Sequence, residues 1–187
     1  MIDHQRKLLF VHIARTGGTS IETALVGEDW WEIDPLTKHV SASMARVIHG
    51  EDIWAKYTTF SVVRNPWDRV VSMWTVGWWY EEGTHFNGIR PVCFRDFVLG
   101  LKPHPHELYG TLHQHEILDE ELDLILRFET LQADFSAMLK RIGCDDIVLP
   151  FKEKSDRRPY ESYYDDETAC AVAEIYKTDI SRYGYNF

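Results

Sequence analysis

The stretch Leu8-Leu9-Phe10-Val11-His12-Ile13-Ala14-Arg15-Thr16-Gly17-Gly18-Thr19-Ser20-Ile21 decides the fold of this chain. Its first six residues are apolar and β-prone, which predicts a buried strand. An amphipathic run that begins at Ser20 predicts a helix, and a short polar turn with two glycines lies between the two. A strand, a glycine turn and a helix in this order direct backbone N–H groups and a helix N-terminus towards an anion.

The residue types in this turn favour phosphate as that anion. Two adjacent glycines let the backbone approach a ligand closely, hydroxyl side chains offer hydrogen bonds, and an arginine adds a permanent positive charge. The alternative is an ordinary strand-to-helix turn, which would be the better interpretation of a bare Gly-Gly pair. The predicted phosphate-binding residues are Arg15, Thr16, Gly17, Gly18, Thr19 and Ser20.

Length and composition predict one soluble globular domain over residues 1–187. The chain is 44% hydrophobic and 27% charged, and 187 residues suffice for one domain with a full core. It carries 20 basic and 30 acidic residues, a net charge of −10. Nucleic acids and anionic membranes are bound by basic surfaces, so we expect neither as a partner.

The three cysteines are widely spaced and odd in number, which predicts neither a disulfide framework nor a zinc site and favours a reducing compartment. The sequence shows no apolar signal segment and no run of about 20 apolar residues that could span a bilayer. We therefore expect a cytoplasmic protein without stable membrane insertion.

A second strand, turn and helix follow at residues 58–80. Residues 58–63 are predicted to form a strand; Asn65 then suits the N-cap of a helix and Pro66 its first position. Arg64 would lie at the carboxyl end of that strand, where open α/β sheets bind their ligands. Ser72 would share a helix face with Asp68. On spacing alone, a surface ion pair for Arg64 is the favoured alternative.

The two turns together resemble those of sulfotransferases that use 3′-phosphoadenosine-5′-phosphosulfate. The usual nucleotide-binding motifs G-x-x-x-x-G-K-[ST] and G-x-G-x-x-G are absent. Residues 12–20 resemble the 5′-phosphosulfate loop H-I-P-K-T-G-G-T-S of the carbohydrate-type, family 2-like branch, with Ala14 and Arg15 departing from it. Residues 63–74 are similar to that family's 3′-phosphate motif, which implies that Arg64 and Ser72 hold the 3′-phosphate.

The resemblance also implies the catalytic residues. A K-H-x-[ST]-A-like stretch follows the loop in the family, and here its histidine is His39, the implied general base. Without the resemblance, a helix cap or a surface position is the better interpretation of His39. Arg15 stands where the family has a lysine and would lie beside the bridging oxygen. Because arginine holds its protons tightly, it would act by charge and hydrogen bonding, and not as an acid.

The sequence also predicts the secondary structure of several further segments. Residues 30–35 read as a loop or short extended piece, and residues 40–48 as a helix capped by Ser41 or Ser43. Residues 94–101 predict a short helix and residues 124–128 a third strand. Glu129-Thr130 is expected to open a further helix, with an apolar stripe from Leu131 to Ile142, that is closed by Gly143. Asp165 or Asp166 is expected to cap a last helix.

Three stretches leave functional alternatives open. Trp74, Trp78, Trp79 and Tyr80 are expected to pack in the core, with an acceptor-binding wall as the alternative. Histidines at 104, 106, 113 and 115 allow a metal site, but prolines break the spacing of the first pair, so we expect no metal. An acceptor-binding loop is favoured there. By resemblance, Lys154 and Ser155 are weaker cofactor-binding candidates.

These observations predict an α/β domain: a three-layer, P-loop-like fold with a central, mainly parallel sheet flanked by helices. The predicted reaction moves a sulfuryl group from 3′-phosphoadenosine-5′-phosphosulfate to an acceptor hydroxyl or amine and releases adenosine 3′,5′-bisphosphate. The family branch favours a saccharide-like or small-molecule acceptor. A nucleoside-phosphate kinase-like transferase and a non-catalytic nucleotide-binding module stay open as alternatives, and neither the acceptor nor the oligomeric state follows from the sequence.

Overall fold

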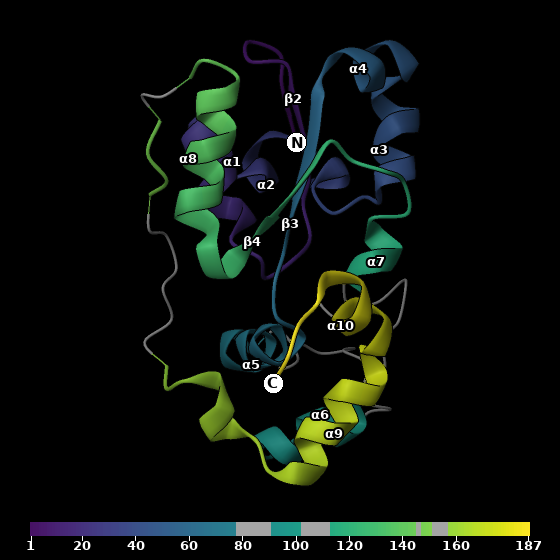
Figure 1. Cartoon of the computed structure of the whole chain (residues 1–187), viewed down its shortest axis with the longest axis vertical. Helices are drawn as coiled ribbons and strands as arrows, with labels where there is room; N and C mark the ends of the chain where they lie inside the picture. The colour runs from purple at the N-terminus through teal and green to yellow at the C-terminus, as the bar shows by residue number, and fades with distance from the viewer. Residues whose placement is uncertain (78–90, 102–112, 145–146, 151–156) are drawn as a thin grey trace. The chain divides into compact units, whose positions relative to one another are not determined.

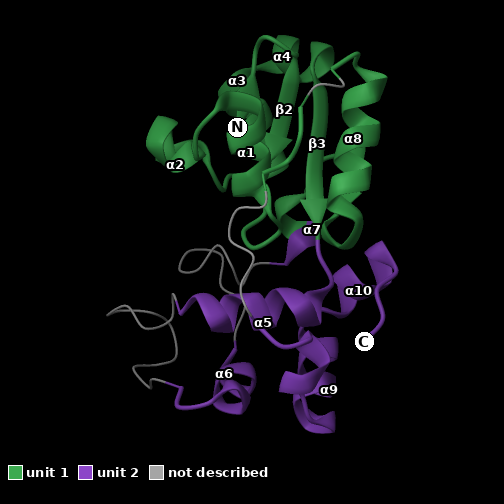
Figure 2. Ribbon diagram, turned by 90° about the vertical axis from the view of Figure 1, so that its left-hand side faces the viewer, with its two compact units in different colours: residues 1–63, 116–154 green, residues 64–115, 155–187 purple. Residues whose placement is uncertain are grey.

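A computed structural model describes residues 1–77, 91–101, 113–144, 147–150 and 157–187 (Figure 1). The chain divides into two compact units (Figure 2). Unit 1 comprises Met1–Val63 and Glu116–Lys154, and unit 2 comprises Arg64–His115 and Ser155–Phe187. The prediction of one domain over residues 1–187 stays a prediction.

Unit 1 is built on a four-stranded sheet of order β1-β2-β3-β4. Its strands are β1 (Ile2–Asp3), β2 (Leu8–Val11), β3 (Thr58–Val63) and β4 (Leu124–Arg127). β2 pairs with β3, and β3 with β4, in parallel; only β1 runs antiparallel, against β2. The predicted α/β class with a mainly parallel sheet is confirmed.

Helices lie on both sides of this sheet, α1 and α8 on one side and α3 and α4 on the other (Figure 1). Phe10 of β2 and Phe60 of β3 point into a core that Ile21 of α1 and Phe135 of α8 complete. The helical segments of unit 1 are α1 (Gly18–Val26), α2 (Trp30–Ile33), η1 (Pro35–Thr37), α3 (Ala42–His49), α4 (Glu51–Lys56), η3 (Phe128–Thr130) and α8 (Leu131–Arg141). α7 (Gln114–Ile117) crosses the boundary between the units.

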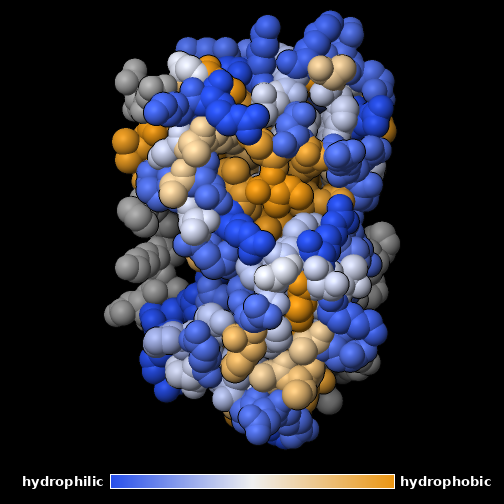
Figure 3. All heavy atoms as spheres, in the orientation of Figure 1, coloured by the Kyte–Doolittle hydropathy of each residue, from blue (hydrophilic) through white to orange (hydrophobic). Residues whose placement is uncertain are grey.

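One apolar area of unit 1 stays at the surface. Figure 3 shows apolar atoms gathered in the region where Figure 1 draws β3 and β4. β4 is the last strand of the sheet, and its Ile125 is 42% exposed.

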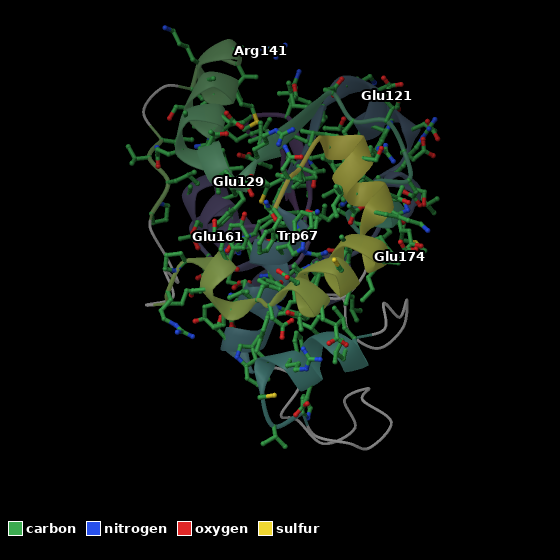
Figure 4. All side chains as sticks on the ribbon, turned by 60° about the horizontal axis from the view of Figure 1, so that its bottom comes forward. Trp67, Glu121, Glu129, Arg141, Glu161 and Glu174 are labelled. Carbon is green, nitrogen blue, oxygen red and sulfur yellow. The ribbon has the colours of Figure 1, made fainter. Side chains whose placement is uncertain are left out.

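Unit 2 is helical in its described residues. It contains α5 (Pro66–Val76), α6 (Phe94–Gly100), η4 (Tyr160–Tyr163), α9 (Asp166–Ile175) and α10 (Lys177–Tyr183). Trp67 of α5 is buried, and its indole N–H donates to the Ala169 carbonyl of α9 at 2.9 Å. Figure 4 shows Trp67 in the interior, whereas Glu161 and Glu174 point outward. Trp74 packs edge-on against Phe94, as a core residue does.

Local sequence signals located several elements correctly. The strand at 58–63 is confirmed, and the Asn65 side chain accepts a hydrogen bond from Trp67 N at the start of α5. Ser41, and not Ser43, caps α3. Asp165 caps α9 in a capping box with Thr168.

Two predictions were wrong, and one strand was missed. Residues 30–35, predicted as loop or extended, are mostly helical because Asp29 caps α2 and Pro35 starts η1. The first two residues of the chain after Met1 form β1, which was not predicted. The predicted last helix is two helices, α9 and α10, which meet at Tyr176.

Trp78, Trp79, Tyr80 and the histidines at 104 and 106 lie outside the described residues. Among the helices that are described, each is too short or too polar to cross a membrane.

Candidate active site

The loop between β2 and α1 has an uncommon backbone conformation at two residues. Arg15 has φ 67° and Gly17 has φ 83°, so both adopt the left-handed conformation. A non-glycine residue in this conformation is uncommon and costs backbone strain. Alternation of left-handed and right-handed residues directs successive N–H groups into one concavity, which is suited to an anion. Gly18 then begins α1.

The loop hydroxyls are divided between structural and ligand-facing roles. The buried Thr16 hydroxyl donates to the Ile13 carbonyl at 2.7 Å, and the Thr19 hydroxyl hydrogen-bonds Asp29. Both therefore stabilise the loop itself. Within the described part of the chain, the Ser20 hydroxyl makes no such bond, so among the predicted hydroxyls it is the one best placed for a ligand.

A buried histidine lies directly beneath the loop. A Cβ atom added at Gly18 would lie 2.1 Å from His12 Nε2, closer than any real contact. His12 Nδ1 lies 2.6 Å from Glu22 Oε1, and its ring stacks on Phe10. Burial lowers the pKa of His12 despite the Glu22 carboxylate, so the ring is neutral and Nδ1 donates to Glu22. The absence of a side chain at position 18 lets the loop rest on this imidazole.

His39 lies next to the same histidine. Its Nδ1 is 3.1 Å from the His12 carbonyl, and its ring centroid is 4.6 Å from that of His12 and 5.6 Å from that of Trp31. Burial is the largest cause of the low pKa of His39, about 3, and His12 and the Lys38 ammonium lower it further. A carbonyl can only accept, so Nδ1 carries the hydrogen of the neutral ring. Nε2 is then the unprotonated nitrogen that can accept a proton, although the low pKa makes it a weak base when no ligand is bound.

Three charged residues around these histidines were not predicted from the sequence. Glu22 is fully buried and accepts hydrogen bonds from His12 and from Lys38 Nζ, the latter at 2.9 Å. The Lys38 ammonium also pairs with Asp29. The only signal in the sequence was that Lys38 adjoins His39, since a pairing across sixteen residues has no local pattern.

Unit 2 holds the two residues expected at a 3′-phosphate. Arg64 is 5% exposed, and its Nε and Nη2 lie 2.9 and 2.8 Å from Asp68 Oδ2. The other Asp68 oxygen pairs with Arg157, so one carboxylate bridges two guanidinium groups. Ser72 is buried one turn further along α5. Arg157 was not predicted as a site residue, and Lys154 and Ser155 lie outside the described residues.

The backbone of Arg64 is fixed by the side chain of Gln114. The Gln114 amide accepts from Arg64 N at 2.8 Å and donates to Arg64 O at 2.9 Å. Gln114 is in turn held through its own N–H, which donates to the buried carboxylate of Asp179 at 2.8 Å. A chain of contacts thus connects Asp179, through Gln114, to the arginine.

The same aspartate belongs to a histidine cluster. His113, His115 and Asp179 each offer a possible metal-ligand atom, all within 4.8 Å of one another. Asp179 Oδ1, however, accepts hydrogen bonds from both the backbone N–H and the Nδ1 of His115, at 2.8 and 2.7 Å. These bonds anchor the start of α7.

Comparison with known proteins adds a match over nearly the whole chain. The family model described as "Sulfotransferase family" matches residues 1–186, and so includes both units. The comparisons gave no match to a curated protein or to a solved structure.

Proposed function

Because the chain belongs to the sulfotransferase family, we propose that it transfers a sulfuryl group from 3′-phosphoadenosine-5′-phosphosulfate to an acceptor hydroxyl. The family supports sulfotransfer in general. The donor, a carbohydrate-like or other small-molecule acceptor and the use of His39 as the base are our proposal, as is the absence of a metal requirement.

The observation that carries this proposal is the arrangement of the loop and His39 around His12. The His12 imidazole lies beneath Gly18, and the His12 carbonyl accepts from His39 Nδ1. An anion-binding backbone and a neutral imidazole with a basic Nε2 therefore share one supporting residue. Sulfuryl transfer needs this pairing, because the donor's leaving phosphate and the acceptor's proton must be handled in one in-line step.

The proposed mechanism assigns one role to each group. The loop N–H groups and the Ser20 hydroxyl would bind the 5′-phosphate and stabilise its charge as it leaves. Arg15 would supply positive charge at the bridging oxygen. His39 Nε2 would accept the proton of the acceptor hydroxyl as its oxygen attacks sulfur, and the S–O bond to the phosphate breaks. Arg64 and Ser72 would bind the 3′-phosphate, with the bridged Arg157 as a neighbouring cation.

Two substitutions of Arg15 test its proposed role, with the lysine variant as the control for the alanine variant. Arg15→Lys is expected to keep activity within about tenfold, because the positive charge remains. Arg15→Ala is expected to lose about 100-fold or more in turnover, as for removal of one donor to a developing oxyanion. Arginine, lysine and alanine all carry a Cβ, so the strain of φ 67° is the same in all three. Wild-type turnover of the alanine variant, measured with labelled donor, would eliminate this role.

The nucleotide specificity tests the proposal most directly. At 100 times its dissociation constant, a ligand stabilises the folded chain by about 2.7 kcal/mol. For a chain of this size that corresponds to a rise in Tm of about 5–10 °C. We expect this rise with adenosine 3′,5′-bisphosphate and little or none with ATP, in a thermal-shift assay without divalent metal.

Each other outcome supports a different function. Selective stabilisation by ATP would favour a kinase-like transferase, and a requirement for magnesium would point the same way. Stabilisation by the bisphosphate without transfer to any acceptor, in a screen with radiolabelled phosphosulfate and extracts of the source organism, would favour a non-catalytic binding module.

A further inference from the structure

The ion pair between Glu22 and Lys38 is the most deeply buried charge pair among the described residues of unit 1. The Glu22 side chain is fully buried and that of Lys38 is 2% exposed. Burying two charges is costly, and a pair of hydrophobic residues would often give equal stability. A pair in this position therefore requires an explanation other than stability.

Both carboxylate oxygens of Glu22 accept hydrogen bonds. Oε1 accepts from His12 Nδ1, and Oε2 accepts both from Trp30 N, at 3.1 Å, and from Lys38 Nζ. Although burial opposes ionisation, the His12 and Lys38 contacts outweigh it and lower the pKa of Glu22. Glutamine has the same shape but only one acceptor oxygen, so it cannot satisfy both sets of donors.

Lys38 connects the same carboxylate to the segment that carries the base. Its Nζ pairs with both Glu22 and Asp29. Asp29 also accepts a hydrogen bond from the Thr19 hydroxyl of α1, and it caps α2. The next residue is His39, whose Nδ1 is bound to the His12 carbonyl. These contacts connect the loop and α1 to α2, to Lys38 and to His39. The hydrogen bond from His39 to the His12 carbonyl leads back to the residue beneath the loop.

We propose that Glu22 and Lys38 are positioning residues that hold the phosphate loop and His39 in one fixed geometry. Glu22 holds the imidazole on which Gly18 rests, and Lys38 holds the backbone that presents His39. This inference rests on the proposed function for its catalytic consequence, but the geometry that it describes can be measured without catalysis.

The test uses Glu22→Gln and Lys38→Met in the full chain, with Lys56→Met as the matched control. Lys56 belongs to the same unit, and its ion pair with Asp52 is exposed. For both buried variants we expect adenosine 3′,5′-bisphosphate to bind about tenfold or more weakly, as for loss of a charge-assisted hydrogen bond. Turnover is expected to fall about 100-fold, as for a misplaced catalytic group. The control should match wild type in both.

Imidazole ¹⁵N NMR of His39 separates positioning from general stability. In wild type and in Lys56→Met we expect a single tautomer with hydrogen on Nδ1, and in Lys38→Met a mixture of tautomers. Lys38→Arg should restore the single tautomer and most of the bisphosphate affinity, since it keeps the charge. If the buried variants fold but keep the wild-type tautomer and bisphosphate affinity, the positioning role is wrong.

The same experiment distinguishes the failure of this inference from failure of the proposed function. If wild-type protein does not bind the bisphosphate, the proposed function fails. The tautomer comparison then still decides positioning: a mixture in Lys38→Met supports it, and an unchanged spectrum overturns it.

Discussion

Gly18→Ala is expected to abolish measurable binding of adenosine 3′,5′-bisphosphate. The added methyl group would lie 2.1–2.6 Å from three atoms of the His12 ring, where no contact is tolerated. The ring cannot move aside cheaply, because it is buried, bonded to Glu22 and packed against Phe10. The loop must therefore shift. We expect at least a 100-fold loss of affinity and about 1–3 kcal/mol of stability, the usual cost of overpacking.

Two further comparisons test whether the contact with His12 causes the losses of affinity and stability in Gly18→Ala. Gly27→Ala introduces the same methyl group at φ 90°, where nothing lies within 4 Å, and should cost stability through backbone strain without weakening bisphosphate binding. In the His12→Ala background, Gly18→Ala should cost little further stability, because the ring is gone. Additive free energies in this double-mutant cycle would contradict the proposed clash.

His39→Asn is expected to reduce turnover by 100-fold to 10,000-fold, the usual range for loss of a general base. The asparagine amide can still donate to the His12 carbonyl, so the local structure and the affinity for the bisphosphate should change little. His49→Asn, a change of the same kind at the end of α3, is the control and should retain full turnover. Wild-type turnover of His39→Asn would remove His39 as the base.

The pKa of His39 also predicts two pH dependences. In the folded protein it is about 3, against about 6.5 in the unfolded chain, so between these values the unfolded chain binds the extra proton. Stability should thus rise with pH through this window and be fully present above it. A bound donor anion raises the pKa, so the acid limb of kcat should lie between about pH 3 and 6.5. Equilibrium unfolding at several pH values and a pH–rate profile measure the two.

The parts of the fold that follow local rules could be predicted from the sequence. Asn65 and Pro66 mark the start of α5, because asparagine suits an N-cap and proline suits the first helical position. The β-prone run at residues 58–63 predicted both ends of β3 correctly. Short elements were missed because they depend on distant partners. α2 begins where Trp30 N donates to Glu22, a contact that no pattern around residue 30 contains.

The candidate site divides in the same way. The loop and His39 could be named as candidates because their motif is contiguous or nearly so, and their roles stay predictions. The carboxylate of Glu22 was missed, since on sequence alone an acidic residue in an amphipathic helix reads as solvent-exposed, and here it is fully buried. The pairing of Asp68 with both Arg64 and Arg157 was missed because Arg157 lies 93 positions after Arg64 in the sequence. The two arginines come close to one carboxylate only in the folded chain.

The pairing of Gln114 with the backbone of Arg64 has a consequence for the kinetics of exchange. The amide makes the same two bonds that one more residue of a neighbouring strand would make. Immobilising one residue's backbone costs about 1–2 kcal/mol of conformational entropy. Here that cost is met during folding, so the 3′-phosphate binding that we propose at Arg64 would not have to order this peptide, and product release would not disorder it. Under that proposal, product exchange would proceed without local unfolding and refolding at Arg64 in every cycle.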